Sequence, residues 1–158
     1  MASVITVGSG DGLAYARHAV EVAERHDDVF ATAAVHPHDA RLVDDKLFDE
    51  VADLFKNPRV VCVGETGLDY HYDLSPREKQ VEVFRRYIRL ARDLGKPISL
   101  HVREAHEEAL GILAEEGASE VGGVAHCFTA GADEARRYLD LGFHVSIPGV
   151  VTFKKANE

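Results

Sequence analysis

Apolar residues follow two alternating patterns along the chain, short continuous runs and stripes at helical spacing. The runs are apolar on both faces and mostly β-branched, which is typical of strands buried inside a parallel sheet. Six strands are predicted, over Val4–Val7, Phe30–Val35, Val60–Val63, Ile98–Leu100, Gly123–Ala125 and Phe143–Ile147. Because helical segments separate these runs, we expect right-handed crossovers and a parallel sheet with its helices outside.

The clearest predicted helix follows the segment Ser75-Pro76-Arg77-Glu78. Ser75 is expected to cap the first turn and Glu78 to complete a capping box, while Gly95 marks the end of the helix. The apolar stripe predicted to face the core consists of Val81, Phe84, Ile88 and Ala91. The face predicted to be solvated carries Arg85, Arg89 and Arg92.

The length of 158 residues suits a single domain, residues 1–158, and is below the roughly 250 residues of a typical eight-unit α/β barrel. The fold class is therefore α/β, with about six parallel βα units. The apolar pattern by itself leaves two architectures open. One is a complete doubly wound sheet, and the other is part of a TIM-like barrel.

Charge and hydropathy narrow the classes of function. Acidic side chains outnumber basic ones by 27 to 18, which disfavours a broad basic surface for nucleic acid, so any chemistry on phosphodiesters would need bound cations. No apolar run approaches the roughly 20 residues of a membrane span, and the first residues lack the features of a signal peptide. We expect a cytoplasmic protein with no membrane partner.

Cys62 and Cys127 form no CxxC pair and are predicted to be reduced, buried thiols.

Polar residues directly follow four of the predicted strands, at the end where parallel α/β sheets carry their functional sites. These residues are His36, Glu65, His101 and His126. A single histidine at such a position is usually a hydrogen-bonded or capping residue, and a single glutamate is usually solvated. Together, however, imidazole and carboxylate groups are ligands for divalent cations such as Zn²⁺ and Mn²⁺. The set therefore predicts a metal site.

The remaining histidines and glycines carry weaker signals. His38 follows Pro37, which marks a strand end, so His38 is expected to be an exposed loop residue. The histidines predicted to lie on helix surfaces are His18, His26 and His106. Gly8, Gly10 and Gly12 lack the GxGxxG spacing of a dinucleotide site.

Five segments form a specific pattern in a fixed order along the chain: Ala34–His38, Val63–Tyr70, Pro97–Ala105, Ala125–Thr129 and Ser146–Lys154. The run Gly64-Glu65-Thr66-Gly67-Leu68-Asp69 is the most specific of them. In these segments the sequence resembles the TatD-type metal-dependent deoxyribonucleases of the amidohydrolase-like barrel superfamily. The resemblance covers essentially the whole chain and implies a partial (β/α)₈ barrel.

The resemblance also implies a function and roles for site residues. The implied reaction is the hydrolysis of phosphodiester bonds in DNA with two divalent ions, Mg²⁺, Mn²⁺ or Zn²⁺. Glu65 would bridge the two ions as the central catalytic residue, and His101 and His126 would bind the second ion. His36 would line the substrate pocket beside the scissile phosphate. Arg103 would contact phosphate, although a structural salt bridge is the alternative for this residue.

Two elements of the family pattern are missing from the sequence. The family's first strand carries Asp-x-His-x-His and a later strand carries Glu-Thr-Asp-x-Pro, and neither motif occurs here. The expected barrel therefore lacks its first strand and its C-terminal units. With Glu65, His101 and His126 alone, the chain is expected to bind at most one ion and to have impaired activity.

Two alternative functions remain open at this stage. One is a non-catalytic fragment or a self-associating module, because an open barrel would expose unpaired strand edges at Val4–Val7 and Phe143–Ile147. The other is a metal-dependent hydrolase of small-molecule amides or esters, since a fold does not fix its chemistry.

Overall fold

A computed structural model describes residues 2–10 and 12–154 of the chain. Within these residues the backbone forms one six-stranded sheet, in which all neighbouring strands are parallel and follow the order of the sequence. The strands are β1 (Val4–Thr6), β2 (Val29–Ala33), β3 (Val60–Asp69), β4 (Ile98–Arg103), β5 (Gly123–Ala125) and β6 (Phe143–Val145). A doubly wound sheet reverses its strand order at a switch point, whereas a barrel does not. The sequential order therefore identifies a partial TIM-like barrel.

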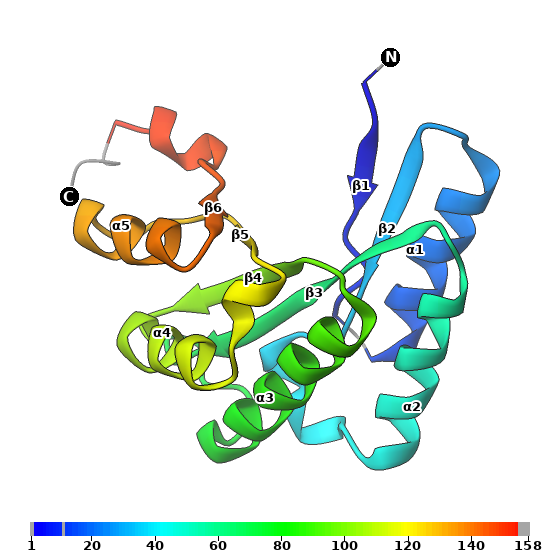
Figure 1. Ribbon diagram of the computed structural model, residues 1–158, viewed down its shortest axis with the longest axis horizontal. Helices are drawn as coiled ribbons and strands as arrows, with labels where there is room; N and C mark the ends of the chain where they lie inside the picture. The colour runs from blue at the N-terminus through cyan, green and yellow to red at the C-terminus, as the bar shows by residue number, and fades with distance from the viewer. Residues whose placement is uncertain (1, 11, 155–158) are drawn as a thin grey trace.

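Helices follow the strands in the order expected for βα units. The α-helices are α1 (Leu13–Arg25), α2 (Asp45–Asp53), α3 (Arg77–Leu94), α4 (His106–Glu115) and α5 (Ala132–Asp140). Short 3₁₀ helices lie at η1 (Pro37–Leu42), η2 (Leu54–Lys56), η3 (Ala118–Glu120) and η4 (Gly149–Thr152). Figure 1 shows the sheet as an open curved wall with α1 to α4 on its outer side, and with β1 and β6 on opposite sides of the opening. None of the helices in the described residues is long and apolar enough to cross a membrane.

The hydrophobic core lies between the sheet and the helices that cover it. Val63 and Ile98 from the strands are fully buried, as are Phe84 and Ile88 from α3 and Leu113 from α4. Burying one such side chain contributes about 1.5–3 kcal/mol before the loss of conformational entropy is counted. This layer fixes the strands, and hence the side chains at the strand ends.

Strand β3 is longer than the apolar run that predicted it. It continues from Val63 to Asp69 because the polar residues in this part pair with β4, with Gly67 opposite His101. Gly67 has a φ of 145°, and a Cβ atom at this position would lie 2.0 Å from the carbonyl oxygen of His101. A residue without a side chain is therefore required where the two strands approach each other.

The start of α3 differs from the prediction. Ser75 does not cap the helix, whose N-cap residue is Pro76. Instead, the buried Ser75 hydroxyl donates to the carbonyl oxygen of His38 at 2.7 Å and accepts from the backbone N–H of Arg41 at 3.1 Å. The tertiary contact with η1 thus replaces the local cap. Val81, predicted in the buried stripe, is only partly buried, while the polar Gln80 is fully packed inside.

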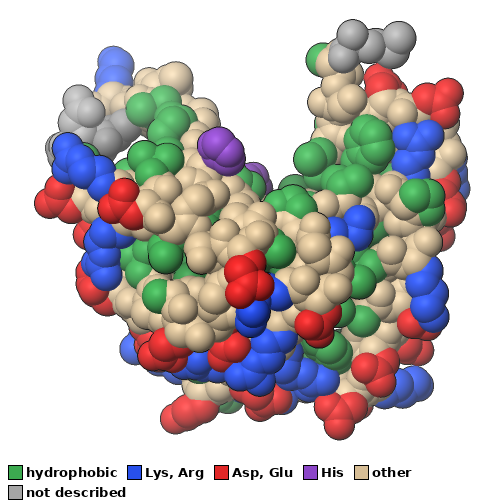
Figure 2. Space-filling model, viewed as in Figure 1, with side chains coloured by type: hydrophobic (Ala, Val, Ile, Leu, Met, Phe, Trp, Pro, Cys, Tyr) green, Lys and Arg blue, Asp and Glu red, His purple; other side chains and the backbone are tan. Residues whose placement is uncertain are grey.

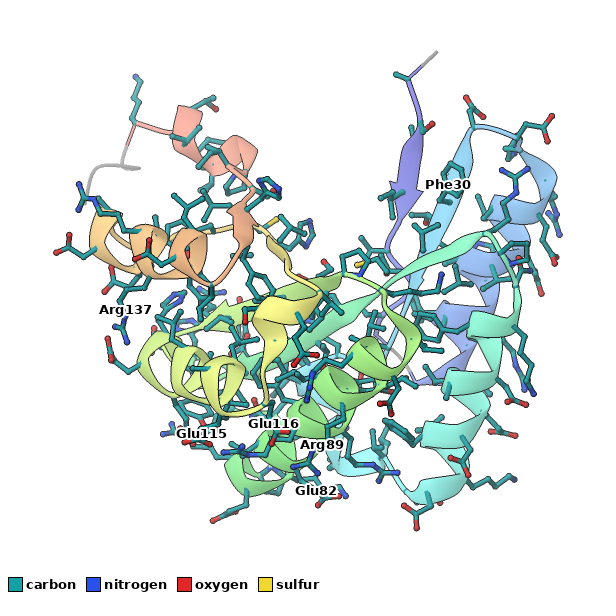
Figure 3. The ribbon with its side chains drawn as sticks, in the orientation of Figure 1. Phe30, Glu82, Arg89, Glu115, Glu116 and Arg137 are labelled. Atoms are coloured by element: carbon teal, nitrogen blue, oxygen red, sulfur yellow. The ribbon has the colours of Figure 1, made fainter. Side chains whose placement is uncertain are left out.

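The basic face of α3 is paired with acidic side chains rather than simply solvated. Its arginines contact the end of α4 and η3, and Figure 3 shows Arg89 and Glu116 meeting on the outer face. We call these residues the outer ion cluster: Arg85, Arg89, Arg92, Glu115, Glu116 and Glu120. The arginines of this cluster lie on the outer face of the molecule as predicted, but each of them forms an ion pair with a glutamate.

The two edge strands expose apolar side chains. Val4 and Ile5 on β1 are 58% and 52% exposed, and Ile147 beyond β6 is 64% exposed. No strand among the described residues pairs with the outer side of β1 or β6. Such edges are able to accept another strand. The self-association expected from the sequence stays a prediction.

Candidate metal centre

Four neighbouring strands bring together the residues predicted from the sequence to form a site: Glu65 and His101 lie within β3 and β4, and His36 and His126 lie just beyond β2 and β5. Glu65 Oε1 lies 2.7 Å from His126 Nδ1 and 3.6 Å from His101 Nδ1. The ring of His36 lies 4.3 Å from that of His101, measured between centroids. Figure 2 shows a deep notch between the two arms of the molecule, with histidine side chains on one wall. The predicted set is therefore one cluster in space.

Asp69 is a member of this region that sequence reasoning missed. Its side chain is fully buried at the end of β3, where Oδ2 accepts from His38 Nε2 at 2.9 Å and from His101 Nε2 at 2.7 Å. Oδ1 accepts from the backbone N–H groups of His71 and Tyr72. The signal available in the sequence was strand alternation, which places Asp69 on the same face as Glu65.

The ionisation of the cluster follows from its hydrogen bonds. Burial favours the neutral form of Glu65, but the neighbouring imidazoles of His101 and His126 outweigh it and lower the pKa of Glu65 to about 2. Burial is likewise outweighed at Asp69, where the Tyr72 N–H, His101 and His38 lower the pKa to about 2. Both carboxylates are therefore negatively charged at neutral pH.

The histidines respond in opposite directions. Burial, together with the neighbouring His101 and His38, lowers the pKa of His36 to about 4, so His36 is neutral at pH 7. Burial also opposes the charge of His101, but the carboxylates of Glu65 and Asp69 outweigh it and raise the pKa of His101. The site thus holds two carboxylates with imidazoles around them.

This donor set fits a divalent cation. His36, Glu65 and His101 each offer a ligand atom, and these atoms lie within 4.8 Å of one another; the same holds for His38, Asp69 and His101. Imidazole nitrogen and carboxylate oxygen are the ligands that Zn²⁺ and Mn²⁺ accept. The negative carboxylates attract a cation, and a histidine that releases its proton becomes a ligand.

Arg103 lies at the mouth of the same site. Its guanidinium lies over the Tyr72 ring, 4.8 Å from the centroid. Together with His101, His126 and Cys127, it lines a pocket of about 450 Å³. The Arg103 guanidinium thus lies between the Tyr72 ring and this pocket, and its N–H groups are of the kind that donate to an anionic ligand.

Two expectations for residues beside the site are wrong. His38 is only partly exposed, because Asp69 draws it inward at the end of the β3 strand. Cys127 is exposed rather than buried, because β5 ends at Ala125 and the backbone then turns, with a φ of 49° at Cys127. Strand alternation no longer applies there, and the Sγ atom lies 3.6 Å from His126 Nε2.

The other predictions for cysteine and histidine have mixed outcomes. Cys62 is buried as predicted, and burial raises its pKa to about 12. His18 and His26 are exposed, as predicted. His106 is partly buried instead, because its ring contacts the hydroxyl of Tyr138 at 3.1 Å.

Comparison with protein families identifies the pattern. A family model described as "TatD related DNase" matches residues 2–158. The chain is 43% identical over 140 residues to the uncharacterised metal-dependent hydrolase YabD of Bacillus subtilis, covering 89% of this chain and 55% of the relative. It is 37% identical over 142 residues to the 3′-5′ ssDNA/RNA exonuclease TatD of Edwardsiella piscicida, covering 89% of this chain and 55% of the relative.

A solved structure extends the similarity to three dimensions. The crystal structure of YJJV, a TatD homologue from Escherichia coli K12, superposes with a TM-score of 0.88 at 25% identity, covering 99% of this chain and 60% of that chain. The chain therefore spans about half the length of the curated relatives that it matches.

Proposed function

Because the chain belongs to the TatD-related DNase family, we propose that it takes part in the metal-dependent hydrolysis of phosphodiester bonds in nucleic acid. The observation that carries this proposal is the buried Glu65 carboxylate on β3, which contacts His126 just beyond β5 and faces His101 on β4. Relatives of the chain carry the names metal-dependent hydrolase and ssDNA/RNA exonuclease. Single-stranded DNA is therefore the first substrate to test.

Glu65, His101 and His126 are the residues proposed to hold a divalent cation, Mg²⁺, Mn²⁺ or Zn²⁺. Such a cation would lower the pKa of water and offset the negative charge of a phosphate. Glu65 is the central catalytic residue in this proposal, because its carboxylate reaches both histidines. Its low pKa keeps the carboxylate charged.

Arg103 and His36 are proposed to bind the substrate. The planar guanidinium of Arg103 faces the pocket and matches the geometry of phosphate oxygens, to which it donates in pairs. His36 is neutral, so its ring nitrogen donates or accepts a hydrogen bond without adding charge. In a chain with a net charge of −9, the substrate needs these local donors and the cation to approach.

The experiment measures hydrolysis of a fluorescently labelled single-stranded oligonucleotide with Mn²⁺, and in parallel hydrolysis of p-nitrophenyl acetate. We expect slow cleavage of the oligonucleotide that stops on addition of a chelator and falls at least tenfold in His126→Asn. Ester hydrolysis that is faster than oligonucleotide cleavage would favour the small-molecule class instead. Cleavage that persists in chelator or in the variant would contradict the proposal.

A further inference from the structure

Asp69 occupies a position between the predicted ligand His101 and the core of the molecule. We propose that Asp69, held in place by Gln80, is a positioning residue that turns the Nδ1 atom of His101 toward Glu65 and keeps its Nε2 atom protonated. This inference rests on the proposed function, since it concerns the same metal centre. It assigns a role to two residues that the predicted set of ligand and substrate-binding residues does not include.

The first step concerns which nitrogen of His101 is free to bind a metal. An ionised carboxylate only accepts hydrogen bonds, so the contact of 2.7 Å between Asp69 Oδ2 and His101 Nε2 requires a proton on Nε2. A neutral imidazole carries one ring proton. Nδ1, which lies 3.6 Å from Glu65 Oε1, is then the nitrogen left with a lone pair. Metal-binding histidines are commonly oriented by a carboxylate in this way.

The second step concerns what fixes the carboxylate itself. Gln80 is 1% exposed and lies on the inner face of α3. Its Oε1 atom accepts from the Asp69 N–H at 2.8 Å, and its Nε2 atom donates to the carbonyl oxygens of Asp69 and Ser75 at 3.2 and 2.9 Å. Both backbone polar groups of Asp69 are therefore held by one side chain from the core.

The Asp69 carboxylate is also held at its other oxygen. Oδ1 accepts from the backbone N–H groups of His71 and Tyr72 at 3.1 and 2.8 Å. These two contacts fix the plane of the carboxylate, so that Oδ2 points at the rings of His101 and His38. A chain of hydrogen bonds thus runs from Gln80 in the core through Asp69 to the Nε2 atom of His101. The Nδ1 atom on the other side of that ring faces Glu65.

A competing explanation is that Asp69 is itself a metal ligand, together with His38 and His101. That arrangement would take the Nε2 atom of His101 for the metal and leave the proton on Nδ1, the atom facing Glu65. One neutral imidazole cannot offer both nitrogens as lone pairs. The four hydrogen bonds already accepted by Asp69 favour the positioning role.

The first test compares Asp69→Asn with Asp73→Asn, a matched change in the same loop at an exposed carboxylate that contacts Arg77. The backbone N–H groups of His71 and Tyr72 keep an oxygen at the Oδ1 position, so the new amide presents its nitrogen at the Oδ2 position and removes the acceptor for His101. We expect affinity for Zn²⁺, measured by calorimetry, to fall about 10- to 100-fold in Asp69→Asn and to stay unchanged in Asp73→Asn.

The second test reads the ring nitrogens directly by ¹⁵N NMR. In the Zn²⁺-loaded wild-type chain, we expect His101 to be bound through Nδ1 and protonated at Nε2. In the metal-free chain, the hydrogen-bonded Nε2 proton should give a slowly exchanging resonance that Asp69→Asn abolishes. A Gln80→Met variant, which keeps the Asp69 side chain, should weaken Zn²⁺ binding in the same direction.

Several results would overturn the inference. They are equal Zn²⁺ affinity in wild type and Asp69→Asn, coordination of His101 through Nε2, or an anomalous scattering peak between His38, Asp69 and His101. The wild-type spectra decide the matter even where a variant fails to fold. If the wild-type chain binds no metal, the proposed function fails, while the Nε2 resonance of the metal-free chain still tests the positioning role.

Discussion

The candidate metal centre and the outer ion cluster both place carboxylates beside nitrogen-bearing side chains, but the two regions differ in which side chains these are. On the outer face, Glu116 accepts from Arg89 and Arg85 at 2.8 Å, and guanidinium groups stay protonated in proteins. On β3, Glu65 and Asp69 accept from imidazoles, which are able to release a proton. Only the inner carboxylates have partners that a metal ion can recruit.

The difference teaches that charge density alone does not identify a functional site. Each arginine of the outer ion cluster pairs with a glutamate. These ion pairs join α3 to the end of α4 and to η3. In the metal centre, the carboxylates are buried and their neighbours are exchangeable. Five changes would break or sharpen this contrast.

The largest expected effect comes from Gly67→Ala, which tests how tightly the strand ends are built. The added Cβ atom would lie 2.0 Å from the His101 carbonyl oxygen, so β3 and β4 must separate. We expect a loss of about 3 kcal/mol or more in the free energy of unfolding, measured by urea denaturation. The matched variant Gly95→Ala, at the end of α3, has open space around its Cβ and should lose only about 1 kcal/mol.

The next effect concerns metal binding, and it compares two glutamates that each lie beside two nitrogen-bearing side chains. Glu65→Gln removes the central charge of the metal centre, and we expect affinity for Mn²⁺ or Zn²⁺ to fall at least about 100-fold, or about 2.7 kcal/mol. Glu116→Gln should leave the affinity unchanged. Calorimetric titration of both variants makes the comparison, and a similar loss in both would remove the distinction between the clusters.

The Glu116→Gln variant should leave metal affinity unchanged but lower the stability of the fold. It removes a carboxylate that accepts from both Arg85 and Arg89 and joins α4 to α3. We expect the free energy of unfolding to fall by about 1 kcal/mol, since solvent screens much of the interaction. Urea denaturation measures the loss, and an unchanged midpoint would show that the outer ion cluster adds no stability.

Acid should expose the contribution of Glu116 without further mutation. Hydrogen bonds from Arg89 and Arg85 outweigh burial and lower its pKa to about 2, from an ordinary value of 4.5. A lowered pKa stabilises the folded chain above pH 4.5 and the effect disappears as the pH falls toward 2. The stability difference between wild type and Glu116→Gln should therefore shrink across this range. A constant difference would contradict the assignment.

The smallest expected effect concerns the exposed end of the outer ion cluster. Arg92 and Glu120 form an ion pair at 2.7 Å with side chains that are 35% and 62% exposed. A double-mutant cycle of Arg92→Gln and Glu120→Gln should give a coupling below about 0.5 kcal/mol. A coupling energy as large as the stability loss expected for Glu116→Gln would mean that the strength of these ion pairs does not depend on their burial.

The sequence predicts the beginnings of the strands better than their ends. The apolar runs place the starts of β1, β3, β4, β5 and β6 correctly, because burial on both faces leaves a direct mark on composition. The extension of β3 to Asp69 leaves no such mark. It depends on pairing with β4 across Gly67, which is a contact between residues distant in the chain.

The candidate site shows the same division. The sequence predicts that His36, Glu65, His101 and His126 lie close together, because each follows an apolar run and parallel strands share one functional edge. Asp69 was missed because the apolar run ends at Val63, so the sequence does not show that the strand continues to Asp69 and that alternation still applies there. Gln80 gave no signal either, since a glutamine near a helix start is ordinary until its three hydrogen bonds are seen.

The Ser75 hydroxyl has a consequence for local unfolding. It joins the loop that carries His38 to the first turn of α3, through the His38 carbonyl and the Arg41 amide. Neither segment can open alone without leaving a buried polar group unpaired. The second and third βα units should therefore behave as one cooperative unit in hydrogen exchange, with the Arg41 amide exchanging only when the start of α3 detaches.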